Sequence, residues 1–368
     1  MLVLHLTNNN YTDVGWSAAL QFLPMLIAGS WAGLIIDRSR KRPVLYLTQV
    51  AFAVLAASLA ALVATGHDPL WAVFTISALV GMVNLFDNPA RQTFVGEMVG
   101  QELLPNAVSL NTVIMNAARV IGPAAGGILV ASVGFAACFA VNAASYLAVL
   151  VALVAMRGAE LQPTKPVRAA KGQVREGLRY VWGEPRLRGP LLTMTVVGIL
   201  AFNFTITLLA LAKGTFHSSN QVASYFMIAM GLGAVVGGLA AARSAQPSER
   251  RLALLGLGFG ATMLLVAVAP TVPLALVALV PMGALSIAFV ATANGTLQLN
   301  SAPQLRGRVM ALYAIAFLGT TPIGAPLIGE IARVTSPRWA IVVGGVATFV
   351  SSTLLLRQGD AATIPSAA

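Results

Sequence analysis

The residues that build catalytic and metal sites are scarce in this chain. A single cysteine, Cys138, excludes a disulfide framework, and the three histidines, His5, His67 and His217, are too scattered to form a metal site at the usual ligand spacing. No Gly-x-x-x-x-Gly-Lys-Ser/Thr loop occurs, which excludes direct use of ATP. We therefore expect no catalytic residues, no cofactor and no metal.

Charged residues are also scarce. They make up 10% of the 368 residues, while 57% are hydrophobic, which leaves too little polar surface to cover a soluble globule. A bilayer core about 30 Å thick needs roughly 20 apolar residues to cross it as a helix. The predicted spans are residues 14–36, 44–65, 70–88, 105–131, 134–156, 189–212, 220–242, 251–269, 273–298, 309–334 and 337–356.

The charges that are present lie mostly between the spans and are unevenly shared. Of 23 Lys and Arg residues, 19 fall in one alternate set of loops. The other set holds only Lys213, Arg333 and Arg338, and Arg119 lies inside a span. Loops rich in Lys and Arg face the cytoplasm. The net charge of +11 therefore indicates topology in the plasma (inner) membrane and not nucleic-acid binding, for which no basic face with interleaved aromatic residues is found.

A long basic loop divides the spans into two groups. It contains Pro163, Pro166 and eight Lys or Arg, and its amphipathic stretch from Gln173 to Trp182 is expected to lie on the membrane surface. The predicted domains are an N-terminal transmembrane bundle at 1–156, a cytoplasmic connector at 157–188, a C-terminal transmembrane bundle at 189–357 and a tail at 358–368.

The two groups of spans resemble each other at an offset of 202 residues. The matching pairs are Gly81 and Gly283, Leu103 and Leu305, Leu110 and Leu312, Gly122 and Gly324, and Gly127 and Gly329. Because the pairs lie in corresponding spans, they predict a duplicated helical bundle with a substrate route between the repeats.

Two motifs connect the chain with a known family. Residues 33–42 read Gly-Leu-Ile-Ile-Asp-Arg-Ser-Arg-Lys-Arg, which resembles the Gly-x-x-x-Asp-Arg-x-Gly-Arg-Lys loop of the major facilitator superfamily. Residues 122–127, Gly-Pro-Ala-Ala-Gly-Gly, resemble its antiporter motif. With segments 87–91 and 306–310, the chain is similar to the drug and siderophore exporter branch. This resemblance implies an all-α integral membrane protein with the major facilitator fold.

Three features depart from the superfamily pattern. Arg40 stands where the loop motif has its second glycine, and the equivalent segment of the second half, 238–243, lacks the acidic residue. The superfamily has twelve transmembrane helices, but about eleven are predicted here, because residues 1–6 are too few to cross a bilayer. We expect either a start codon assigned too late or a truncated protein.

The resemblance places a gate at the loop motif. Asp37 is expected to contact the start of the span at 309, where free N–H groups and the helix dipole favour a carboxylate; the alternative is a solvated turn. Lys41 and Asp87 either extend this ion network or are ordinary charges at headgroup level. The residues assigned to the gate and loop motif are Gly33, Asp37, Arg38, Lys41, Arg42, Asp87 and Arg91.

The antiporter motif combines small residues with a proline. Gly122, Gly126 and Gly127 allow close approach of a neighbouring helix, while Pro123 leaves the carbonyl of Arg119 free and permits a kink. Arg119 itself lies near mid-span, where an unpaired cation is costly. It either makes a structural ion pair or hydrogen bond, or anchors an anionic or carbonyl-rich substrate.

Few groups are available for coupling and substrate binding. Asp13 and Glu330 lie at the outer side, on helices that are neighbours in the superfamily; they form either a carboxylate pair that takes up a proton or two separate interfacial acids. The residues expected to line a central cavity are Gln21, Asn84, Asn111, Asn116, Asn203, Thr205, Thr207, Asn294 and Gln298, with Phe22, Phe202, Phe204 and Phe289.

These features predict a monomeric secondary exporter in the lipid bilayer that moves small amphipathic molecules by alternating access in exchange for protons. Two alternatives stay open. One is a facilitator without proton coupling, and the other is a non-transporting sensor or degenerate remnant.

Overall fold

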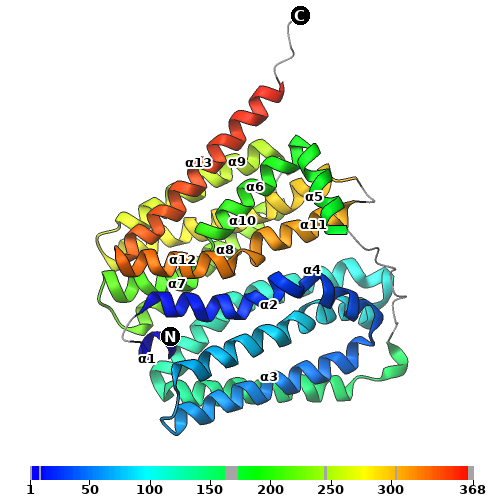
Figure 1. Cartoon of the computed structure of the whole chain (residues 1–368), viewed down its shortest axis with the longest axis vertical. Coiled ribbons are helices and arrows are strands. Elements are labelled where there is room, and N and C mark those ends of the chain that lie inside the picture. The colour runs from blue at the N-terminus through cyan, green and yellow to red at the C-terminus, as the bar shows by residue number, and fades with distance from the viewer. Residues whose placement is uncertain (1, 8–9, 162–172, 244–246, 303–304, 364–368) are drawn as a thin grey trace, which may run out of the picture. The chain divides into compact units, whose positions relative to one another are not determined.

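The computed structural model describes residues 2–7, 10–161, 173–243, 247–302 and 305–363, and within these ranges it contains helices and no strands (Figure 1). Side chains at some helical positions, including those of Asp37 and Arg119, lie outside the description. The elements are α1 (Leu2–Leu6), α2 (Tyr11–Arg38), α3 (Lys41–Ala64), α4 (Leu70–Ala155), η1 (Gly158–Glu160), α5 (Gln173–Gly183), α6 (Pro185–Leu200), α7 (Phe204–Ala210), η2 (Leu211–Thr215), α8 (Asn220–Arg243), α9 (Glu249–Val268), α10 (Val272–Asn300), α11 (Arg306–Ala314), η3 (Ile315–Gly319), α12 (Thr321–Val334) and α13 (Pro337–Thr363).

Over the part of the chain so described, nine helices are long and apolar enough to cross a membrane. Two further predicted spans, 14–36 and 105–131, also lie in helices, α2 and α4. The all-α membrane architecture predicted from the apolar runs is therefore confirmed. At the C-terminus, α13 continues to Thr363, beyond the end predicted at residue 356.

α4 is one run of 86 helical residues but not one straight rod. A straight helix of that length would measure about 130 Å, because it rises 1.5 Å per residue. α3 contacts it at two distant places: Thr48 donates to Asp87 Oδ1 at 2.8 Å, and the ring of Phe52 stacks on Tyr146 with centroids 5.3 Å apart. Gly134, with φ of +83°, supplies the left-handed backbone conformation for a reversal. The run therefore folds back, as its cyan-to-green course shows (Figure 1).

Two predicted spans are interrupted. The span predicted at 189–212 breaks at residues 201–203, between α6 and α7, and then becomes the π-helix η2. The span predicted at 309–334 contains the π-helix η3 between α11 and α12. A Cβ added at Gly198 would overlap the carbonyl oxygen of Ala316, and one added at Gly324 would overlap that of Ile199. The two interrupted helices therefore pack backbone against backbone beside their breaks.

The chain forms two compact units. One contains Leu2–Asn8 and Trp16–Ala170, and the other contains Asn9–Gly15 and Lys171–Ala368. In the first unit, α2, α3 and α4 share an apolar core built around Ile36, Leu45, Ala90, Phe94 and Leu153.

Equivalent helices cross at equivalent glycines in both halves. A Cβ at Gly81 of α4 would overlap the carbonyl oxygen of Gln21 in α2, and a Cβ at Gly283 of α10 would overlap that of Met230 in α8. Gly81 and Gly283 are one of the pairs matched at the offset of 202 residues. The same offset relates α7 to α1. The matched residues thus occupy corresponding close crossings.

Candidate functional site

Asp87 is the centre of a buried polar network between α3 and α4. Its side chain is only 1% exposed. Oδ1 accepts hydrogen bonds from Thr48 Oγ1 at 2.8 Å and from Gln49 Nε2 at 2.9 Å, while Oδ2 lies 3.5 Å from Arg91 Nη2. A buried carboxylate is tolerated only when it is paired and hydrogen-bonded, and these three partners meet that requirement. Asp87 and Arg91 were predicted from the sequence, whereas Thr48 and Gln49 were not.

A second buried ion pair lies close to the loop motif. Lys41 Nζ is 3.7 Å from Glu97 Oε1, and the two side chains are 7% and 9% exposed. The pair joins the first residue of α3 to the region after Asp87 in α4. Glu97 was not among the predicted residues, although an acid at the end of a span and on the same side as the loop motif is a signal for it.

Arg42 binds the end of α4. Its Nε and Nη2 donate to the carbonyl oxygen of Leu153 at 3.1 and 2.6 Å, and Nη2 donates to that of Met156 at 2.7 Å. The last carbonyls of a helix have no donor within the helix, and a basic side chain satisfies them. Arg42 therefore fastens α3 to the last span of its own unit.

The other loop-motif residues are less fully described. Arg38 is exposed at the end of α2. The surroundings of Gly33 and the side chain of Asp37 lie outside the description, as do the side chains of Arg119 and Pro123. Their predicted roles stay proposals.

The opposite end of α2 packs on α12. A Cβ on Gly15 would lie 2.5 Å from the carbonyl oxygen of Ala325, and one on Gly329 would lie 2.5 Å from that of Tyr11, so the two backbones are in reciprocal close contact. Thr12, beside Tyr11, belongs to this contact. The predicted neighbourhood of these two helices is therefore present.

Charges at this contact are partly neutralised by an arginine. Thr12 Oγ1 donates to Glu330 Oε2 at 2.6 Å, and Arg333 Nη2 lies 2.5 Å from Glu330 Oε1. Glu330 is therefore held by Thr12 and Arg333, and the alternatives of a carboxylate pair with Asp13 or of two separate acids stay predictions. Glu330 would have to give up its guanidinium partner to accept a proton.

The antiporter motif lies in α4. Gly122 is exposed, Gly126 is half-buried and Gly127 is buried. A Cβ added at Gly122 or Gly126 meets no described heavy atom within 4 Å. Among the described residues, the close helix approach predicted at these two glycines is therefore absent.

The equivalent position in the second half behaves differently. Gly324, which matches Gly122, touches the backbone of Ile199 in α6. Among the described residues, the contact made by Gly324 is therefore not matched at Gly122.

Polar and aromatic groups gather at the interrupted helices. Asn203 is 6% exposed, and its Nδ2 donates to the carbonyl oxygen of Ile199 at 2.7 Å, beside the break. The ring of Phe202 lies 5.2 Å from Phe204, 5.6 Å from Phe259 and 5.1 Å from Phe317, between centroids. The structure thus brings together three residues predicted to line the cavity. Phe259, in the continuous helix α9, and Phe317, in the π-helix η3, were missed, because no motif in the sequence marks either of them.

The remaining predicted cavity residues are distributed over several helices. Gln298 Nε2 donates to Asn294 Oδ1 at 2.6 Å along α10. Phe289 is fully buried and packs beside Phe259 with ring centroids 6.3 Å apart, so it belongs to the core of its unit. The side chain of Asn116 lies outside the description. The half-buried amide residues are Gln21, Asn84, Asn111 and Asn294.

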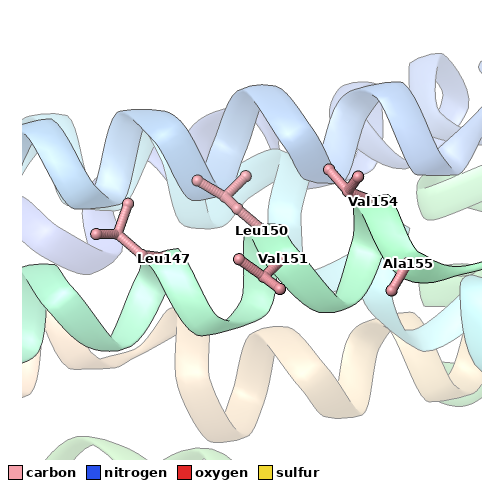
Figure 2. Close-up of a pocket in the computed structure, with 5 residues that line it drawn as sticks. All are labelled: Leu147, Leu150, Val151, Val154 and Ala155. Atoms are coloured by element: carbon pink, nitrogen blue, oxygen red, sulfur yellow. The ribbon is translucent and has the colours of Figure 1, made fainter.

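A hollow of about 490 Å³ lies along the last span of α4 (Figure 2). Its lining residues are Leu147, Leu150, Val151, Val154 and Ala155. Their spacing places them on one helical face, and none has a polar side chain. The hollow therefore suits lipid chains and offers nothing to orient a polar substrate.

Comparison with known proteins identifies the family. A family model of the major facilitator superfamily, described as "Transmembrane secretion effector", matches residues 10–367. The chain belongs to this family. It is 26% identical over 339 residues to the multidrug efflux pump Tap of Mycolicibacterium fortuitum, covering 88% of this chain and 82% of the relative. It is 24% identical over 347 residues to the enterobactin exporter EntS of Shigella flexneri, covering 94% and 82%.

Solved structures agree on the fold. A mutant of the nucleoside transporter NupG matches with a TM-score of 0.72 and 12% identity, over 97% of this chain and 93% of that one. A D-xylose-proton symporter matches with a TM-score of 0.73 and 13% identity, over 94% and 87%. At such identities the likeness concerns the fold alone. The chain is therefore a multi-pass membrane transporter of the major facilitator superfamily, and its family and fold are not those of enzymes.

Proposed function

We propose that this protein is a monomeric exporter of small amphipathic molecules, drug-like compounds or siderophores, driven by exchange for protons. The observation that carries the proposal is the pair of relatives: a multidrug efflux pump and an enterobactin exporter differ in cargo but share export. The aromatic rings beside Asn203 are the proposed binding region, since they place apolar groups next to a polar one, the combination that an amphipathic molecule needs.

Polar and charged contacts near both ends of α2 support alternating access. This mechanism needs a set of contacts at each end of the transporter, and the two sets must open in turn. Beside the loop motif lie the network of Asp87 and the pair of Lys41 and Glu97. At the other end, Thr12 and Glu330 link α2 to α12. Asp37 is the proposed latch at the first end, acting on the helix that begins at Arg306. The cluster around Glu330 is the proposed site of proton coupling at the second.

The transport proposal is tested in proteoliposomes. The fluorescent dye ethidium and enterobactin serve as probes, with an imposed pH gradient and a clamped membrane potential. Uphill accumulation of either probe would support proton-coupled export. Equilibration without accumulation would leave only an uncoupled facilitator, and no movement through a well-folded protein would favour the non-transporting alternative.

The proposed orientation places the basic loops in the cytoplasm. In a Cys138→Ala background, Ser219→Cys should react with an impermeant maleimide added to intact cells, because Ser219 is exposed in a loop on the proposed outer side. Glu160→Cys, exposed on the opposite side, should react only after the cells are opened. The reverse labelling pattern would overturn the orientation.

A further inference from the structure

One side of α5 is fixed to the start of α11 (Figure 1). Glu176 Oε1 lies 2.5 Å from Arg308 Nη1, and the backbone N–H of Ala302 donates to Tyr180 Oη at 3.1 Å. A Cβ on Gly177 would come within 3.0 Å of Arg308 Cβ, and Val181 is fully buried. The helix thus has a docked face that contacts Ala302, just after α10, and Arg308, in the first turn of α11.

The other side of α5 is exposed and carries large apolar side chains, which a water-facing surface seldom does. Leu178 is 46% exposed and Trp182 is 53% exposed. Arg179 is exposed as well. With a helical period of 3.6 residues, these three positions fall on one face, away from Gly177 and Val181. Two more exposed arginines, Arg186 and Arg188, follow at the start of α6.

We propose that this face binds the anionic surface of the adjacent lipid leaflet. Through its contacts with Arg308 and Ala302, α5 then couples this lipid binding to the position of the start of α11. A leucine and a tryptophan beside arginines match an interface with apolar chains below and negative headgroups above. The apolar pair inserts at the boundary of the acyl chains, and Arg179 extends to the lipid phosphates. The charge complementarity selects phosphatidylglycerol-type lipids over zwitterionic ones.

The docked face gives this binding a consequence for transport. Arg308 and Ala302 flank the N-terminus of α11, to which the proposed Asp37 latch binds. Anionic lipid held by α5 therefore stabilises one position of that N-terminus and changes how easily the latch forms. This consequence rests on the proposed function, whereas the lipid binding does not.

Membrane insertion is measured without any transport assay. A spin label at Leu178→Cys in a Cys138→Ala background is compared with one at Glu160→Cys, in nanodiscs of phosphatidylcholine with and without phosphatidylglycerol. At position 178, collisions with oxygen should exceed those with a water-soluble nickel chelate, and at 160 the order should reverse. Predominant nickel access at 178 would mean a water-facing helix, and protection from both reagents would mean a protein-covered one; either result overturns the proposal.

The contribution of the Arg179 charge to lipid binding is tested with a separate variant. Phosphatidylglycerol should increase the ratio of immersed to water-exposed label at position 178. Arg179→Gln should reduce this ratio about fivefold, because one arginine near an anionic surface contributes about that factor. Glu160→Gln is the matched control and should leave the ratio unchanged. An equal response of wild type and Arg179→Gln to the anionic lipid would contradict the assigned role of Arg179.

Coupling to α11 is read from amide hydrogen exchange. In wild type, amides from Leu305 to Leu312 should exchange more slowly in nanodiscs containing phosphatidylglycerol than in phosphatidylcholine alone. Glu176→Gln combined with Tyr180→Phe should remove this difference while the label at 178 stays immersed. A difference that persists in the double variant would show that α5 does not transmit lipid binding, whatever the outcome of the transport experiments.

Discussion

Replacing Gly283 with leucine is expected to prevent the C-terminal bundle from assembling. α8 and α10 cross with their backbones in contact, and a side chain at Gly283 would overlap the carbonyl oxygen of Met230. Gly233 makes the reciprocal contact with Val280 on the same pair of helices. A backbone carbonyl cannot change rotamer as a side chain can, so the helices must separate along the crossing, at a cost of about 3 kcal/mol, the upper end of the usual cost of overpacking. Size-exclusion chromatography and thermal unfolding in detergent measure this loss.

Gly126→Leu is the matched control within a transmembrane helix. A Cβ at Gly126 meets no described heavy atom within 4 Å, so the variant should elute and unfold like the wild type. If Gly283→Leu also behaved like the wild type, the close crossing of α8 and α10 would be wrong. If Gly126→Leu folded but lost efflux, the close approach expected of the antiporter motif would occur in another conformation of the transport cycle.

Most of the helical framework follows from lengths of apolar sequence. Membrane spans must satisfy their backbone hydrogen bonds internally, so a run of about 20 apolar residues predicts a helix almost regardless of its neighbours. The break in the span predicted at 189–212 does not follow from composition. Residues 201–203 contain no proline or glycine. Their break accompanies tertiary features: the contact of Gly324 with Ile199 and the side chain of Asn203 on the carbonyl of Ile199.

The charged network beside the loop motif was predictable only in part. The loop motif identified Lys41 and Arg42, and segment 87–91 identified Asp87. The partners of these residues lie far along the chain, at Glu97, Leu153 and Gln49. Pairing of this kind depends on how α3 and α4 pack, which a single sequence does not encode locally. In the structure Arg42 donates to carbonyl oxygens at the end of α4, and its predicted part in the gate stays a proposal.

Removing the carboxylate of Asp87 is expected to destabilise the protein and to lower its efflux, and the two effects can be separated. In Asp87→Leu, Gln49 Nε2 loses its buried acceptor, while Thr48 Oγ1 keeps the carbonyl oxygen of Leu45 at 3.0 Å. One stranded buried donor costs about 1–3 kcal/mol. Thermal unfolding in detergent should therefore detect a lower stability than in wild type.

The double variant Asp87→Leu with Gln49→Leu supplies the control, because it removes the stranded donor and leaves an apolar contact between α3 and α4. Its stability should return close to that of the wild type. Efflux should nevertheless stay about tenfold lower than in wild type. A loss of about 1.4 kcal/mol in the preference of the gate for one state shifts the population of that state about tenfold. Wild-type efflux in the stable double variant would mean that Asp87 only holds α3 against α4. Low efflux with restored stability would mean that the gate needs the negative charge itself, buried at 1% exposure beside Arg91.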